Sequence, residues 1–330
     1  MSRETILSLL LAHPGAFVSG GAMSQQLGIS RAAVWKAIET LREEGYVITS
    51  APTRGYRLES APDRIREGEL SGHLTDCTLG SHLLCLEVID STNTECKRQA
   101  MAGAPHGLAV LSEEQTGGRG RLGRSFQSPK GCGLYLSLLL RPQLPPQEVV
   151  DFTAWVAVAV CDGIQAACGT RPQIKWTNDI VLNGKKLCGI LTELGLESET
   201  NSLQYLVTGI GVNVNHAPED FDEEIRSMAT SLSIELGRPV RRAALAVEIL
   251  KALDRMYAGF PHNKQEYLDR YRADCLTVGK QVQLITPASR QEARALAVDD
   301  AFRLVVELPD GTRKALSAGE VSVRGMYGYI

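Results

Sequence analysis

The chain has 330 residues, of which 44% are hydrophobic and 22% charged, and its formal net charge is −3. This length allows two or three domains with real cores, and the balanced charge excludes a global attraction to nucleic acid, so any DNA binding must come from a local surface. The start lacks a signal-peptide pattern and no uninterrupted apolar run reaches membrane-spanning length, so we expect a cytoplasmic protein with no membrane association. The eight scattered cysteines form no C-x-x-C pair, so we expect reduced thiols and no protein-bound metal centre.

Hydrophobic periodicity predicts three helices and a hairpin at the N-terminus. The predicted elements are helices over 3–12, over 22–27 and from Ser30 onward, and strands over 46–49 and 56–58. Gly28 is a typical helix-stop residue, and Ser30 is a natural N-cap for the third helix. Three helices followed by a hairpin are typical of a winged helix-turn-helix, which we assign to residues 1–60.

The second helix of a helix-turn-helix enters the major groove with its N-terminal residues toward the bases, and hairpin arginines are expected to contact phosphates. Residues 1–60 hold 6 Lys/Arg and 5 Asp/Glu, so the charge of this segment has the right sign. The alternative is a helical cap that only packs or binds protein. The candidate DNA-binding residues are Ser30, Arg31, Ala32, Trp35, Lys36, Arg54 and Arg57.

Residues 60–69 are polar, contain Pro62 and suit a linker. Alternating helix-like and strand-like stretches then predict a mixed α/β domain, which we place at 66–273. Its expected elements are strands at 83–89, 109–115, 134–140, 180–182, 186–193 and 205–214, and helices at 93–102, 147–168 and 241–258. The final segment, 274–330, contains short strands and a tight turn at Pro309-Asp310-Gly311, which predict a small β-barrel.

The densest motif is a run of glycines and arginines after a predicted strand, Gly117-Gly118-Arg119-Gly120-Arg121-Leu122-Gly123-Arg124. Glycine lets the backbone approach a ligand, and arginine supplies forked donors that suit carboxylate and phosphate. One alternative is an exposed basic loop that contacts RNA. A clamp for an anionic ligand is favoured, because the run is short and lies between apolar strands. The motif is neither a P-loop nor a dinucleotide-binding fingerprint.

A second motif is Lys175-Trp176-Thr177-Asn178-Asp179, followed by Lys186-Leu187-Cys188-Gly189-Ile190-Leu191. Asn183-Gly184 between them is a hairpin turn, so Lys186 follows a turn and precedes an apolar strand, where it could point inward as a charge. The alternative is that Lys185 and Lys186 are solvated and that Asn178-Asp179 is only a turn.

Taken together, these residues closely resemble the bifunctional biotin protein ligases that are also biotin operon repressors, the BirA family. The resemblance spans nearly the whole chain. The matching segments are Asp90-Ser91-Thr92-Asn93, Gln115 with Gly118-Arg119-Gly120-Arg121-Leu122-Gly123-Arg124, the two motifs at 175–179 and 186–191, Gly209-Ile210-Gly211-Val212-Asn213, and Ser30-Arg31-Ala32-Ala33-Val34-Trp35-Lys36 in the head. Thr177 stands where some members have proline, and Phe126 where a tryptophan can stand.

The resemblance implies a central domain like the class II aminoacyl-tRNA synthetases and an SH3-like C-terminal barrel. It implies that biotin and ATP form biotinoyl-5′-AMP, with Mg²⁺ on the triphosphate, and that biotin then passes to a lysine of the biotin carboxyl carrier protein of acetyl-CoA carboxylase. It also implies a homodimer that binds operator DNA when the adenylate is bound, so that biotinoyl-AMP is the corepressor of biotin synthesis genes.

Biotin carboxylate and the α-phosphate are both negative, so cations must offset their repulsion. Lys186 is expected to bridge the two anions, with Arg121 as second cation and Arg119 shaping the loop over biotin. Asp179 is a candidate to orient or deprotonate the carrier lysine. By resemblance, the biotin-binding residues are Ser91, Thr92, Asn93, Gln115, Gly118, Arg119, Gly120, Arg121, Lys186, Gly189 and Gly209, and the nucleotide-binding residues are Arg121, Phe126, Asn178, Lys186 and Asn213.

Three alternative functions stay open at this point. A lipoate-type ligase shares the α/β domain and the chemistry but lacks this arginine-glycine loop. A regulator could have lost catalysis, although the intact loop and Lys186 argue against this. A ligase whose winged helix no longer binds DNA is the third alternative.

Overall fold

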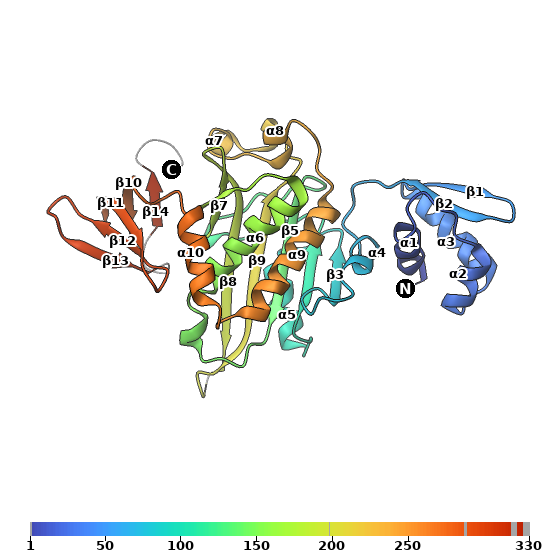
Figure 1. Cartoon of the computed structure of the whole chain (residues 1–330), viewed down its shortest axis with the longest axis horizontal. Coiled ribbons are helices and arrows are strands. Elements are labelled where there is room, and N and C mark those ends of the chain that lie inside the picture. The colour runs from blue at the N-terminus through green and yellow to red at the C-terminus, as the bar shows by residue number, and fades with distance from the viewer. Residues whose placement is uncertain (1, 198, 287–288, 318–321, 326–330) are drawn as a thin grey trace.

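The structure is a computed structural model that describes residues 2–197, 199–286, 289–317 and 322–325. A helical head at the N-terminus and a small sheet at the C-terminus lie at opposite ends of a large central sheet (Figure 1).

The head forms the three helices and the hairpin that its sequence predicts. Its elements are α1 (Ser2–Leu11), α2 (Gly20–Leu27), α3 (Arg31–Glu43), β1 (Val47–Ala51) and β2 (Gly55–Ser60). The Ser30 hydroxyl accepts a hydrogen bond from the Ala33 amide at 3.1 Å, and Gly28 ends α2 with φ 63°, so both predicted helix signals are confirmed. The apolar stripes meet in a separate small core that includes Ile6, Leu7, Val34, Ile38 and Leu41.

The central domain is built on a seven-stranded sheet of order β3-β4-β5-β9-β8-β7-β6. All neighbours pair antiparallel except β3 and β4. The strands are β3 (His82–Leu86), β4 (Leu108–Ser112), β5 (Gly133–Leu140), β6 (Gln173–Lys175), β7 (Asp179–Leu182), β8 (Lys185–Leu196) and β9 (Leu203–Asn213). The six predicted strands of this region are present, and the short edge strand β6 was not predicted.

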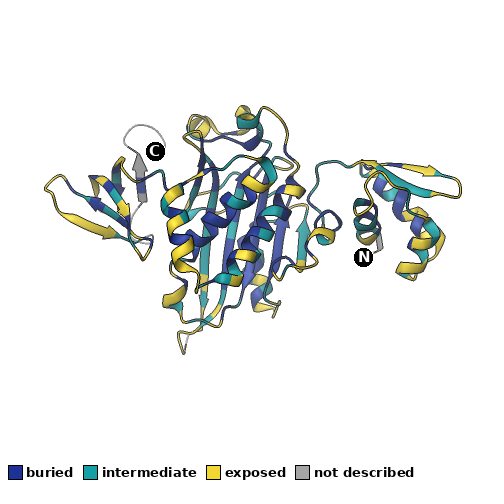
Figure 2. Ribbon diagram, viewed as in Figure 1, coloured by how far each residue is buried: buried dark blue, intermediate teal, exposed yellow. Residues whose placement is uncertain are grey.

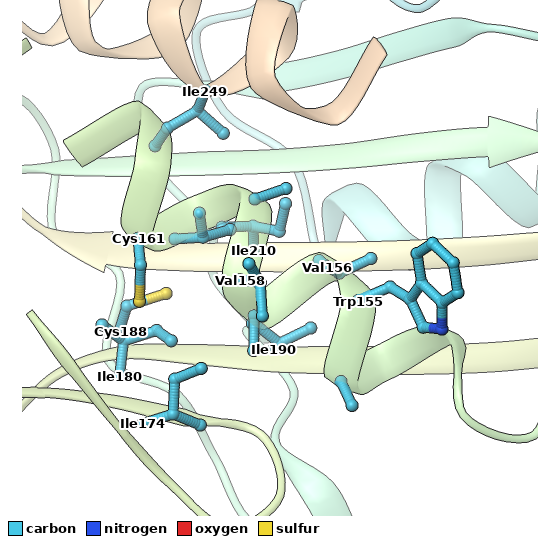
Figure 3. Close-up of a cluster of buried hydrophobic side chains, with 14 of the residues drawn as sticks. Trp155, Val156, Val158, Cys161, Ile174, Ile180, Cys188, Ile190, Ile210 and Ile249 are labelled. Carbon is cyan, nitrogen blue, oxygen red and sulfur yellow. The ribbon is translucent and has the colours of Figure 1, made fainter. Parts of the chain in front are cut away.

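Helices cover both faces of the sheet. They are α5 (Thr92–Met101), α6 (Phe152–Cys168), α9 (Arg242–Gly259) and α10 (Lys264–Asp274), with short turns α4 (Glu67–Leu70), α7 (Glu223–Arg226) and α8 (Leu232–Leu236). Val158 of α6 lies over Ile190 and Ile210 of the sheet, and Cys161 lies beside Cys188 (Figure 3), while α9 packs on α6. The stretch 146–168 is apolar and long enough to cross a membrane, but α6 is the core helix and is buried along most of its length (Figure 2).

The C-terminal part is a five-stranded antiparallel sheet of order β13-β12-β11-β10-β14. Its strands are β10 (Gln281–Ile285), β11 (Arg290–Val298), β12 (Leu304–Glu307), β13 (Arg313–Leu316) and β14 (Ser322–Gly325). The predicted turn joins β12 to β13, with Gly311 at φ 83°. Among the described residues no pairing joins β13 to β14, so the closure of a barrel is not seen.

The segment between the head and the central sheet is fastened on both sides. The Arg242 side chain, 1% exposed, donates to the Asp63 carboxylate at 2.9 Å and to the Glu113 carboxylate at 2.7 Å. Tyr46 of the head donates to Glu69 at 2.9 Å, and Arg241 donates to the other oxygen of that carboxylate at 2.7 Å. A hydrogen bond from Tyr46 and ion pairs to Arg241 and Arg242 therefore hold the linker between the head and the central domain.

Candidate active site and DNA-binding surface

A cavity of about 630 Å³ lies on the sheet face opposite α6. Ile190 and Ile210 point into the core with α6, so the alternate residues of β8 and β9, which include Gly189, Gly209 and Gly211, point to the cavity side. The start of α5, the glycine-arginine loop, the loop over 221–229 and two residues of the C-terminal sheet complete the wall.

This cavity brings together nearly all of the residues that the sequence assigned to the ligase site. Those that line it are Ser91, Thr92, Asn93, Gln115, Arg119, Gly120, Arg121, Phe126, Asn178, Asp179, Lys186, Gly189, Gly209 and Asn213. Gly118 does not line it. A Cβ at this position would lie 2.3 Å from the Phe126 carbonyl oxygen, so packing within the loop requires this glycine.

The glycines of β8 and β9 form a trough that two side chains fill. A Cβ at Gly209 would lie 2.0 Å from Asn93 Oδ1, and a Cβ at Gly211 would lie 2.6 Å from the Phe126 ring. The space over Gly209 is therefore occupied by the Asn93 amide rather than left open. Asn93 Nδ2 in turn donates to the Glu193 carboxylate at 2.8 Å, which fixes the amide in place.

A hydrogen-bonded polar wall stands at one end of the cavity. Gln115 Oε1 accepts from the Thr92 amide at 2.9 Å and from the Thr92 hydroxyl at 3.1 Å, and Gln115 Nε2 donates to the Ser128 hydroxyl at 2.8 Å. The Ser137 hydroxyl lies 2.7 Å from both Thr92 Oγ1 and Asn93 Oδ1. Because these groups hold one another, their remaining donors and acceptors have fixed directions.

The glycine-arginine loop closes on itself as a narrow hairpin. The Phe126 amide donates to the Gly118 carbonyl at 2.9 Å, and the Gly120 amide donates to the Arg124 carbonyl at 2.7 Å. Leu122 at the tip has φ 56° and is 68% exposed. The loop is therefore an ordered flap with an apolar tip beside the cavity.

Arg121 fastens this flap to the second motif. Its Nη1 donates to Asn178 Oδ1 at 2.8 Å, and Asn178 Nδ2 donates to the Ile190 carbonyl at 2.9 Å. Burial lowers the pKa of Arg121 from its usual value, but a guanidinium stays charged in proteins. Asn178 therefore aims a permanent cation into the cavity.

Lys186 reaches the cavity because of a β-bulge between β7 and β8. Val181 pairs with Lys186 and Ile180 with Cys188, so Leu187 is the extra residue. Leu187 and Cys188 are both buried in the core, whereas Lys186 turns to the cavity. Its ammonium lies 2.8 Å from the Asp179 carboxylate.

The backbone of Lys186 is also clamped by the loop that follows β9. The Lys186 amide donates to the Met228 carbonyl at 2.8 Å, and the Thr230 amide donates to the Lys186 carbonyl at 2.9 Å. The strand, the bulge and this loop together fix where the ammonium lies.

Several cavity residues were missed at the sequence level. Lys175, 6% exposed, is opposite Asp179 in the β6–β7 pairing and lies in a motif that was recognised, so it could have been proposed. Gln283 and the loop over 221–229 reach the cavity only through tertiary packing, and nothing periodic marks them in the sequence. The C-terminal sheet also braces the second motif, because Trp176 Nε1 donates to the Phe302 carbonyl at 2.9 Å.

The head presents its candidate DNA-binding residues on one exposed helix and one hairpin. Ser30 caps α3, and Arg31, Ala32 and Lys36 are exposed on it. Trp35 is 57% exposed on the same helix, so its ring is accessible to a partner. Arg54 and Arg57 lie on the hairpin, as predicted.

Three known protein families match separate parts of the chain. The biotin/lipoate A/B protein ligase family matches residues 85–213, an HTH domain matches 2–57, and the biotin protein ligase C terminal domain matches 277–324.

Curated relatives match the chain along its length. The bifunctional ligase/repressor BirA of Bacillus subtilis (strain 168) is 37% identical over 317 residues, which cover 96% of this chain and 97% of that protein. The bifunctional ligase/repressor BirA of Escherichia coli (strain K12) is 30% identical over 96% of each chain. The biotin protein ligase of Aquifex aeolicus in complex with biotin and ATP has a TM-score of 0.63 at 27% identity and covers 74% of this chain and 99% of its own. The chain belongs to the family of bifunctional biotin protein ligases and repressors.

Proposed function

We propose that the chain joins biotin to ATP in this cavity, releasing pyrophosphate, and transfers biotin from biotinoyl-5′-AMP to a lysine of the biotin carboxyl carrier protein of acetyl-CoA carboxylase. The observation that carries this proposal is the meeting of Lys186, Arg121 and the polar wall around Gln115 in one cavity. Its volume of about 630 Å³ lies within the roughly 300–1,000 Å³ of small-molecule sites.

In the first step a biotin carboxylate oxygen attacks the α-phosphorus and pyrophosphate leaves. Lys186 would lie between the two anions and balance the charge that grows in the transition state. The Asp179 carboxylate, 2.8 Å away, holds the ammonium ready before either substrate binds. Arg121 supplies the second cation, and Asn178 acts by holding Arg121 in place.

The polar wall suits the hydrogen-bonding head of biotin, so Ser91, Thr92, Gln115 and the backbone of the flap are its proposed contacts. Asn93 and Gly209 would shape the wall from behind, because the Asn93 amide fills the space above that glycine. Phe126, over Gly211, offers a ring for adenine, and Asn213 lies on the same side of the cavity. Arg119 is exposed on the flap and would close over biotin.

In the second step the carrier lysine attacks the acyl carbon and AMP leaves. Once the phosphate of the adenylate pairs with Lys186, Asp179 is released to accept the proton or to orient the incoming amine. The flap would keep water from the mixed anhydride until the carrier arrives.

Mg²⁺ is expected to accompany ATP. Groups of three histidine, cysteine or carboxylate side chains that could hold a metal are absent from the described residues. Mg²⁺ in nucleotide sites commonly keeps its waters and binds phosphate oxygens with one or two carboxylates, and Asp222 and Glu224 line this cavity. No step above depends on the ion.

The chain would also repress biotin synthesis genes by binding to operator DNA. The exposed face of α3 and the hairpin support this part of the proposal. The adenylate would favour a homodimer that matches a two-fold operator, and by linkage the dimer would bind the adenylate more tightly. Sedimentation with and without biotin plus ATP tests this, and an unchanged monomer would count against it.

An Arg31→Ala variant should lose operator affinity and keep ligase activity.

The finer architecture belongs to the same proposal. We expect a class II synthetase-like domain at 66–273, preceded by the winged helix at 1–60 and followed by an SH3-like barrel at 274–330. Antiparallel pairing and the order of the described strands support both assignments. A cytoplasmic location agrees with the eight free cysteines.

The decisive test is incubation with biotin, ATP and a carrier domain, followed by mass spectrometry of the carrier. We expect one biotin on one lysine, and no label when lipoate replaces biotin. Labelling by lipoate instead would favour the lipoate-type ligase. Absence of both labels together with absent biotin-dependent ATP–pyrophosphate exchange would favour a regulator without catalysis.

A further inference from the structure

An aromatic side chain of the head holds two arginines of the hairpin. The guanidinium carbon of Arg54 lies 4.3 Å from the centroid of the Phe17 ring, and that of Arg57 lies 4.7 Å from it. Phe17 is half-buried and immediately precedes the segment that leads into α2. It was not among the residues that the sequence assigned to DNA binding.

The two arginines differ in their other partners. Arg57 Nε donates to Glu59 at 2.8 Å and its Nη2 lies 2.7 Å from the same carboxylate, so much of its charge is already balanced. Within the described ranges no carboxylate lies within salt-bridge distance of Arg54, which is exposed near the hairpin turn. Arg54 is therefore the cation that remains available to an external anion.

The ring is fixed relative to the hairpin by the backbone. The Val18 amide donates to the Tyr56 carbonyl at 2.8 Å, and the Tyr56 amide donates to the Val18 carbonyl at 2.9 Å. A Cβ at Gly55 would lie 2.1 Å from the Val18 carbonyl oxygen, so the two segments touch without space between them. These contacts keep the Phe17 ring next to the two arginines.

We propose that Phe17 is a positioning residue that holds Arg54 as a clamp for a DNA phosphate. Arg57, which is paired with Glu59, contacts the same ring and helps to keep it in place. This inference rests on the proposed DNA-binding function. An arginine loses much rotamer freedom when it grips a phosphate, and a ring that already fixes the guanidinium reduces this entropic cost. The guanidinium keeps N–H groups at its edge for the phosphate while its flat face rests on the ring.

The test is a double-mutant cycle on Phe17 and Arg54, with Phe17→Tyr as the conservative variant. The probe is a duplex of about 40 base pairs, selected by the wild-type protein from a random pool in the presence of biotin and ATP, which is long enough for two half-sites. Phe17→Leu removes the aromatic face and keeps apolar bulk. It should weaken binding about fivefold, which corresponds to a cation–π contact of about 1 kcal/mol, whereas Phe17→Tyr should bind like the wild type.

Arg54→Ala should weaken binding more and lower the slope of log K against log salt by about one contact. Adding Phe17→Leu to Arg54→Ala should then have little further effect. Biotin labelling of the carrier and the thermal unfolding of each variant serve as controls for the fold. If the two substitutions instead weaken binding independently, or Phe17→Leu binds like the wild type, the clamp is wrong while DNA binding stands. If the wild type selects no duplex, the proposed repressor function fails and the clamp fails with it.

Discussion

At the scale of single residues, the cavity depends on glycines as much as on charged groups. Two of the three glycines that face it from β8 and β9 do not leave empty room, because Asn93 and Phe126 press against them. Glycine weakens a strand interior, and close approach of another group is the usual reason for its presence. Here the approaching groups are the side chains that shape the ligand site.

Gly209→Ala should therefore harm both stability and biotin binding. The new methyl would lie 2.0 Å from Asn93 Oδ1, and Asn93 cannot retreat because Ser137 and Glu193 hold its amide. Overpacking of this kind costs roughly 1–3 kcal/mol. Differential scanning calorimetry with a biotin titration would measure both effects. Gly117→Ala is the matched control, since its methyl would be 3.4 Å from the nearest atom. Equal melting temperatures for the two variants would contradict the assignment.

The motifs that resemble the family were enough to assign Lys186, Arg121 and Gln115 to one site, because these motifs follow one another in the family's order. They could not show that Gly118 is required for packing within the loop, or that the Asn93 amide is engaged in hydrogen bonds within the protein. The first fact depends on how the loop folds back on itself, and the second on contacts between segments that are far apart in the chain. The bulge that turns Lys186 toward the cavity also follows from pairing with β7, which no local pattern specifies.

At the scale of elements, two loops form the sides of the site. The glycine-arginine flap is closed by its own backbone hydrogen bonds, and the loop after β9 clamps the backbone of Lys186. Phe221 of that second loop lines the cavity and stacks on His216, with ring centroids 5.2 Å apart and planes at 14°. His216 is 1% exposed, and neither of its ring nitrogens has a hydrogen-bond partner among the described residues.

His216 should make the protein less stable in mild acid. Burial lowers its pKa from 6.5 to about 4, Arg242 adds to the lowering, and Asp220 opposes it. The unfolded chain takes up a proton near pH 6.5 while the folded chain resists. Stability is therefore full above that pH and falls as the pH drops toward 4, by on the order of 3 kcal/mol in all.

A His216→Phe variant keeps the stacked ring and loses the titrating group. Thermal melts between about pH 7 and pH 5 should show the wild type losing more stability than the variant as the pH falls. Parallel curves for the two proteins would mean that this histidine does not contribute to acid sensitivity.

Element prediction succeeded where periodicity is strong and local. The α6 stretch, α9 and the long strands were predicted within a few residues. The predicted helix over 147–168 begins only at Phe152, because the prolines at 145 and 146 produce a separate turn before it. The missed α10 has exposed polar residues around most of its surface and buries only Tyr267, Leu268 and Tyr271, so its sequence shows little amphipathic contrast.

At the scale of the whole molecule, the three parts are joined by specific contacts. Gln283 and Val323 bring the C-terminal sheet to the cavity, while the linker fixes the head to the central domain. Glu113, which accepts from Arg242, is only two residues from Gln115 of the polar wall. Arg242 thus connects Asp63 of the linker to Glu113, which lies next to the polar wall of the ligase site.

Arg242→Met should strongly destabilise the central domain. It would leave the Glu113 carboxylate, 7% exposed, without its cation. Breaking a buried pair from one side costs roughly 3–5 kcal/mol. Adding Glu113→Gln should recover part of the loss, because the unpaired charge is then gone, and Arg238→Ala at an exposed position is the control. Calorimetry would compare the wild type, Arg242→Met, the double variant and Arg238→Ala. A melting temperature of Arg242→Met equal to that of Arg238→Ala would refute the role of this pair.

The central claim is that cations gathered at one cavity hold two mutually repelling anions together while they react. Biotin-dependent exchange of labelled pyrophosphate into ATP measures this step directly, before any carrier is needed. The account predicts clear exchange by the wild type and by Lys185→Ala, whose side chain is exposed, and a loss of roughly 10²–10³-fold in Lys186→Ala. Exchange by a folded Lys186→Ala protein at the wild-type rate would contradict it.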